Sequence, residues 1–147
     1  MKKKKKMTCT FCEKEIETRN SNNADPFKGR CCEECNFEYV IPTRYGLALN
    51  KAVLFVQTDT ESKVEMIEED IKNLDIKDYR TLIGEGEFVR IEPIIFDVDN
   101  ITYAALVETD AIAHQRKLNK MWKKFRYSKY TRPLYGNVLL LRYDSMK

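Results

Sequence analysis

Four of the five cysteines in this chain have a spacing that suits a metal ion. Cys9 and Cys12 are separated by two residues, and Cys32 and Cys35 repeat that spacing further along. Two such pairs joined by a loop are typical of a zinc site, because each pair can point both thiolates at one ion and two pairs complete its tetrahedron. We therefore predict that Cys9, Cys12, Cys32 and Cys35 bind Zn²⁺ as their cofactor.

The fifth thiol, Cys31, precedes the second pair directly. Cys31 could replace Cys32 as a ligand, but three residues would then separate it from Cys35, whereas Cys32 keeps the two-residue spacing. We expect Cys31 to be a spare thiol beside the metal. A disulfide framework is the alternative, and it normally requires an even number of cysteines and an oxidising compartment. The cysteine count is odd, and the initial lysines are not followed by the apolar stretch of a signal peptide.

Catalytic chemistry is not predicted. Four thiolates leave no open position on the ion, and the single histidine, His114, lies far from the cysteines. No Ser/His/Asp or Cys/His arrangement is recognisable, and His114 has no identifiable partner in the sequence. We therefore expect that the protein is not an enzyme.

Charge is unevenly distributed along the chain. The net charge is +3, but removing the five lysines at positions 2–6 from the 26 basic residues leaves 21 against 23 acidic residues. Residues 1–6 are expected to form a disordered, lysine-rich tail. Acidic residues dominate residues 61–78, whereas residues 111–143 contain no Asp or Glu.

Two folded parts are predicted. Residues 7–44 are poor in apolar side chains, and a unit below about 40 residues usually needs a metal, a disulfide or a partner to fold. Metal binding should therefore supply the folding energy of this part. Residues 51–147 have regular apolar patterning and are long enough to enclose a modest core. We predict a zinc-binding module at 7–44, followed by an α+β domain at 51–147.

Within the α+β domain, the predicted order is strand, helix, hairpin, helix, strand. The first helix is expected within residues 61–74, because Val64, Ile67, Ile71 and Leu74 recur at helical spacing among acidic residues. A short helical turn is expected at residues 78–83, before Gly84. The predicted strands are residues 52–57, 88–96, 101–107 and 136–141, with a hairpin turn at residues 97–100.

The strongest helix signal covers residues 116–126. Leu118, Met121, Trp122 and Phe125 fall on one face of such a helix, and cations occupy the other. Tyrosines and further cations follow to residue 132. The predicted partner-binding residues are Arg116, Lys117, Lys120, Lys123, Lys124, Arg126, Tyr127, Lys129, Tyr130 and Arg132.

Three elements occur together in the cysteine segment: Cys9-x-x-Cys12, Asn22-Asn23-Ala24-x-Pro26 and Gly29-x-Cys31-Cys32-x-x-Cys35-Asn36. In these elements the segment resembles the short zinc-binding proteins that phages and prophages of Gram-positive bacteria encode. Residues 52–141 more loosely resemble another group of small phage proteins of unknown function. The resemblance implies a phage origin and no particular reaction. The odd cysteine count and the lack of a signal-peptide pattern predict a cytoplasmic location, which for a phage protein is the cytoplasm of an infected bacterial cell.

Small phage accessory proteins often act by binding, so the resemblance favours a protein that inhibits or redirects a host protein, for example one of a defence system. One alternative is nucleic-acid binding through the cations and tyrosines of residues 116–132. A second is sequestration of a small anionic nucleotide ligand in a pocket lined by Arg and Tyr. The acid-rich and cation-rich segments could also pair between two chains, so a homodimer stays open. No membrane partner is expected, because the apolar runs are too short to span a bilayer.

Overall fold

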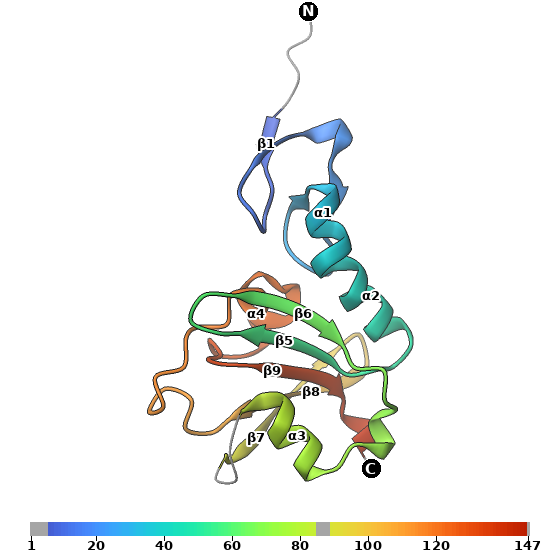
Figure 1. Cartoon of the computed structure of the whole chain (residues 1–147). Helices are drawn as coiled ribbons and strands as arrows, with labels where there is room; N and C mark the ends of the chain where they lie inside the picture. The colour runs from blue at the N-terminus through green and yellow to red at the C-terminus, as the bar shows by residue number, and fades with distance from the viewer. Residues whose placement is uncertain (1–5, 85–88, 147) are drawn as a thin grey trace, which may run out of the picture.

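The structure, a computed structural model, describes residues 6–84 and 89–146 (Figure 1). Most of the predicted lysine-rich tail, residues 1–5, therefore lies outside the described residues. Lys6 begins the first strand, β1 (Lys6–Thr8). None of the described helices is both long enough and apolar enough to cross a membrane.

A five-stranded antiparallel sheet forms the centre of the molecule, which confirms the predicted α+β class. Its spatial order is β6-β5-β9-β8-β7, so the last strand of the chain lies between two hairpins (Figure 1). The strands are β5 (Val53–Gln57), β6 (Ser62–Met66), β7 (Ile91–Val98), β8 (Ile101–Glu108) and β9 (Val138–Arg142).

The predicted helix within residues 61–74 is wrong, because Ser62–Met66 forms strand β6 beside β5. The Thr58 N–H donates to the Glu61 carbonyl at 2.9 Å, and the Glu61 N–H donates to Thr58 Oγ1 at 2.9 Å, which reverses the chain. In β6, Val64 is buried and its neighbours Lys63 and Glu65 are exposed, so successive side chains point to opposite faces, as in a strand. The apolar residues that follow continue into the 3₁₀ turn η3 (Ile71–Asn73).

Local sequence explains the next two elements. Helix α3 (Ile76–Ile83) starts at a capping box, in which the side chains of Asp75 and Asp78 each accept from the other's backbone N–H at 3.0 and 2.9 Å. The helix ends at Ile83, directly before Gly84, where the sequence predicted the end of a short helical turn. Asp99 and Asn100 have φ values of 50° and 68°, which suits the tight two-residue turn joining β7 to β8.

Both faces of the sheet are covered. On one face, α3, η3 and the C-terminal turn η5 (Tyr143–Met146) pack on Leu54, Leu106 and Leu139. On the other, Phe55 and Leu140 contact a second cluster that includes α4 (Lys120–Lys124). Only these five residues of the predicted helix 116–126 are α-helical, because Asn119 caps the helix by accepting from the Trp122 N–H at 2.8 Å. A 3₁₀ helix, η4 (Arg126–Tyr130), follows.

The N-terminal segment consists of two small hairpins and a helix that reaches the edge of the sheet (Figure 1). Gly46 in this helix lies so close to β5 that an added Cβ would stand 2.3 Å from Val53 Cγ2. After β1, the elements are β2 (Glu15–Glu17), η1 (Thr18–Asn20), β3 (Asn22–Asn23), β4 (Arg30–Cys31), α1 (Glu33–Cys35), the π-helical η2 (Asn36–Val40) and α2 (Ile41–Ala48).

Candidate functional site: a four-cysteine cluster and a cationic segment

Two different local structures position the cysteine pairs. Cys9 and Cys12 lie in the turn between β1 and β2, which the Cys9 N–H closes by donating to the Lys14 carbonyl at 2.8 Å. Cys32 precedes the first turn of α1, and Cys35 lies within that turn. Burial, together with hydrogen bonds to the neighbouring Cys32 and Cys9 thiols, raises the pKa of Cys35.

The structure brings Cys9, Cys12, Cys32 and Cys35 together with their Sγ atoms within 4.8 Å of one another. The Cys32 Sγ is 3.9 Å from both the Cys9 Sγ and the Cys12 Sγ. A tetrahedral site with metal–sulfur bonds of about 2.3 Å has sulfur–sulfur edges of about 3.8 Å. All the cysteines are free, so the arrangement fits four thiolates around one metal ion.

Electrostatics differ between Cys9 and Cys31. Burial alone would raise the pKa of the Cys9 thiol, but backbone N–H groups of Cys12, Cys32 and Phe11 lower it to about 6. Cys31 is fully buried on β4, and burial together with the neighbouring thiolates raises its pKa to about 11. Cys31 lies outside the group of four.

The cysteine segment packs directly on the sheet, and Phe27 is its principal contact. The ring of Phe27 lies 6.0 Å from Phe55 and 5.5 Å from Phe125, measured between centroids. Backbone bonds support this contact, because the Lys28 N–H donates to the Lys124 carbonyl at 2.9 Å and the Arg126 N–H donates to the Pro26 carbonyl at 2.8 Å. Cys9, Cys32 and Cys35 thus share one apolar cluster with the sheet.

Several of the predicted partner-binding residues have partners within the chain. Lys124 donates to the Phe11 carbonyl at 3.5 Å, and Arg126 pairs with Asp25 at 2.7 Å. Arg116 pairs with Glu108, and Arg132 pairs with Glu92.

The tyrosines of the segment also contact other aromatic rings. Tyr127 is half-buried against Phe125 and Tyr103, and burial raises its pKa to about 12. Tyr130 stacks on Phe96, and Lys129 lies 5.3 Å above the Tyr130 ring. Among the described residues, Lys117, Lys120 and Lys123 are exposed with no side-chain bond or ion pair.

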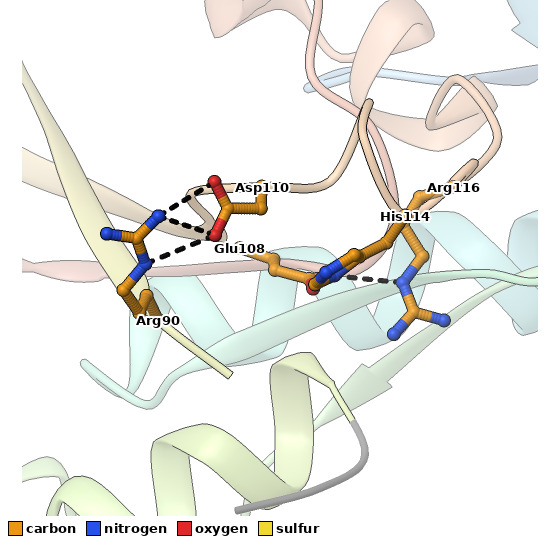
Figure 2. A network of polar contacts seen from close by, with 5 residues as sticks. All are labelled: Arg90, Glu108, Asp110, His114 and Arg116. Atoms are coloured by element: carbon orange, nitrogen blue, oxygen red, sulfur yellow. Dashed lines mark hydrogen bonds and ion pairs between the residues drawn. The ribbon is translucent and has the colours of Figure 1, made fainter. Parts of the chain in front are cut away.

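His114, for which the sequence showed no partner, has one in the fold. Its Nδ1 contacts the carboxylate of Glu108, which is buried at the end of β8 with a side-chain exposure of 3% (Figure 2). The Arg116 Nε donates to the same carboxylate at 2.9 Å. Burial acts to raise the pKa of Glu108, but these two partners outweigh burial and hold the pKa below its ordinary value.

The signal for this network was a carboxylate at the end of an apolar strand, followed within eight residues by a histidine and an arginine. The chain returns over the strand end between them, where the His114 N–H donates to the Asp110 carbonyl at 2.9 Å. The Asp110 carboxylate accepts three hydrogen bonds from the Arg90 guanidinium, which hold the start of β7 against this turn (Figure 2).

Comparison with family models, with curated proteins and with solved structures gives no match to this chain. The resemblance of the cysteine segment to phage proteins therefore stays a prediction.

Proposed function

We propose that the protein is a zinc-stabilised binding protein, and that Zn²⁺ is the ion held by the four cysteines. The carrying observation is the set of four sulfur atoms that lie within 4.8 Å of one another, with Cys32 Sγ 3.9 Å from both Cys9 Sγ and Cys12 Sγ. Closed four-thiolate sites are typical of structural zinc, and they leave no position for a substrate. The ion would then fix the N-terminal hairpins and helix, and binding would occur elsewhere.

Metal analysis of the purified protein tests the ion and its ligands. We expect one equivalent of zinc per chain in the wild type and in Cys31→Ser, and loss of the ion in Cys32→Ser. Another metal at one equivalent after purification from zinc-containing medium would refute the choice of ion. Loss in Cys31→Ser with retention in Cys32→Ser would refute the ligand set.

For the binding surface, the proposed residues are the exposed lysines around α4. Lys123 borders a hollow of about 290 Å³, and Arg132 stands on its rim. Its lining includes the apolar surfaces of Leu118, Trp122 and Pro133. Cations around an apolar hollow suit an acidic segment of a partner protein that carries one apolar anchor, because the anchor supplies buried area and the charges supply orientation. The phage resemblance of the cysteine segment suggests a host protein as that partner.

A charge-reversal pair tests this surface. Lys120→Glu/Lys123→Glu removes two exposed cations of α4, of which Lys123 lines the hollow. Lys72→Glu/Lys77→Glu is the matched control around η3 and α3, on the other face of the sheet. Lys124 is left unchanged, because it contacts the Phe11 carbonyl and its loss would disturb the fold.

The test is affinity capture from nuclease-treated bacterial lysate, followed by reconstitution with the purified partner. We expect a protein bound by the wild type and the control and lost with Lys120→Glu/Lys123→Glu. Equal capture by all three proteins would refute the surface.

Nucleic-acid binding is the second candidate, favoured by the three unpaired lysines together with the exposed ring of Tyr130. Phosphate contacts would make the affinity fall steeply with salt. Against it, Arg126 and Arg132 are paired with carboxylates, which reduces the cation row available to a phosphate backbone. Capture that disappears on nuclease treatment would favour this candidate over the protein partner.

A further inference from the structure

A second hollow, of about 450 Å³, lies at the N-terminal end of the cationic segment, residues 116–132. Its lining includes His114, Arg116 and Lys117, together with Thr58 and Asp59 of the β5–β6 turn. Asn137 completes the base, where its Oδ1 accepts from the Gln57 N–H at 2.9 Å and its Nδ2 donates to the Leu82 carbonyl at 3.0 Å. This volume is within the range of small-molecule sites.

The arginine in this lining is held in place before any ligand arrives. Its Nε is bonded to the buried Glu108, and the two terminal nitrogens point away from that carboxylate (Figure 2). Among the described residues, those terminal nitrogens have no hydrogen bond or ion pair. A guanidinium fixed through Nε and free at both terminal nitrogens is preorganised for two further bonds to a planar or tetrahedral anion.

The backbone around Arg116 is fixed as well. The Arg116 N–H donates to the Ala111 carbonyl at 2.9 Å, and the Gly136 N–H donates to the Lys117 carbonyl at 2.8 Å. The stem of Arg116 lies against Gly136, where an added Cβ would stand 3.3 Å from Arg116 Cγ and where φ is 73°. The left-handed conformation favours glycine at 136, and an added Cβ there would press on the stem of Arg116.

We propose that this hollow binds a small phosphomonoester, with the phosphate between the terminal nitrogens of Arg116 and the ammonium of Lys117. A phosphomonoester carries a charge of about −1.5 to −2 at neutral pH and three terminal oxygens, which matches two cations with several free donors. His114 lies beside them, held by the same carboxylate as Arg116. Asp59 is the single carboxylate of the described lining, and it opposes an anion. The site is separate from the docking surface proposed above.

Binding of AMP to the full-length, zinc-loaded protein tests the site, with inorganic phosphate and adenosine as the other probes. We expect saturable binding of AMP at constant ionic strength, weaker binding of phosphate and none of adenosine. Arg116→Gln should weaken AMP binding at least about tenfold, because charge-assisted bonds to phosphate are among the strong ones. Lys117→Gln is the second variant, because the exposed Lys117 side chain has no bond among the described residues and its loss leaves the fold intact.

Two further variants test whether AMP affinity follows the charge of the hollow and whether a cation outside the hollow matters. Asp59→Asn removes the opposing carboxylate and should tighten AMP binding, whereas Lys129→Gln removes an exposed cation outside the hollow and should leave it unchanged. The proposal is overturned if AMP does not bind, if Lys129→Gln weakens it as much as Lys117→Gln, or if an oligonucleotide without a terminal phosphate competes equally well. Failure here leaves the Lys120/Lys123 surface untouched, because neither lysine lines this hollow.

Discussion

The cysteine module (residues 7–44) and the five-stranded sheet are stabilised by different interactions, although they share one apolar cluster. In the module, the four clustered cysteines, which could hold a metal ion, lie where two hairpins and a helix meet. In the sheet, every residue of β5 is buried, and helices or turns cover both faces. A short segment with a metal cluster and a longer one with an apolar core should therefore respond differently to the same perturbation.

Metal removal should produce the largest difference in stability between the cysteine module and the sheet. Structural zinc contributes about 10–16 kcal/mol of apparent binding free energy in small zinc peptides, so chelation should unfold residues 7–44. We expect residues 51–147 to keep the sheet, with exposure of the Phe55 and Phe125 rings on which Phe27 packs. Amide hydrogen exchange before and after chelation measures both parts. Simultaneous loss of protection in β5 and β9 would show that the module and the sheet unfold as one unit.

The contact that joins the two regions should have the next largest effect. Phe27→Ala leaves a cavity between the module and the sheet, and a buried Phe→Ala change typically costs about 3–5 kcal/mol. Denaturant unfolding followed by fluorescence of the buried Trp122 measures the loss. Phe37→Ala is the matched control, because Phe37 is 61% exposed and its removal should change the free energy of unfolding by less than about 0.5 kcal/mol. Equal losses in both variants would contradict the packing.

Within the sheet region, the buried carboxylate of Glu108 should make stability depend on pH. Its pKa is held below the ordinary value of 4.5 by His114 and Arg116, so folding is favoured by the ionised form. This stabilisation is present above pH 4.5 and is lost as the pH falls through the lower folded pKa. Glu108→Gln should remove that part of the acid sensitivity and cost roughly 1–3 kcal/mol at neutral pH. Parallel pH dependences of the free energy of unfolding in both proteins would argue against it.

The smallest effect is expected from the ion pair across the module boundary. Arg126 and Asp25 are both more than half exposed, and exposed pairs contribute about 0–1 kcal/mol. Arg126→Gln should therefore lower the free energy of unfolding by less than about 1 kcal/mol, and the loss should shrink in high salt. A larger loss that persists in salt would mean that the backbone bond from Arg126 to Pro26, rather than the charge, had been disturbed.

Local spacing in the sequence was sufficient for the features that depend on local geometry. The C-x2-C repeats predicted which thiols gather, because a metal ion imposes the same short spacer on each pair. The strand–turn–strand pattern around residues 97–100 predicted the β7–β8 hairpin, although Asp97 and Val98 belong to β7 and the turn itself is Asp99–Asn100, where both residues have positive φ. The burial of Met121, Trp122 and Phe125 also followed from their helical spacing.

Tertiary structure alone decided the remainder, because those features depend on residues that are distant in the chain. Val64 and its neighbours formed an edge strand rather than a helix, since β5 offers unpaired backbone groups that the sequence does not display. Some cations of the cationic segment pair with carboxylates that are distant in the sequence, and others stay exposed. Arg126, for example, pairs with Asp25, which lies 101 positions earlier in the chain. Glu108 met His114 and Arg116 only after the chain turned back over the end of β8, and burial then made one carboxylate the common support of both side chains.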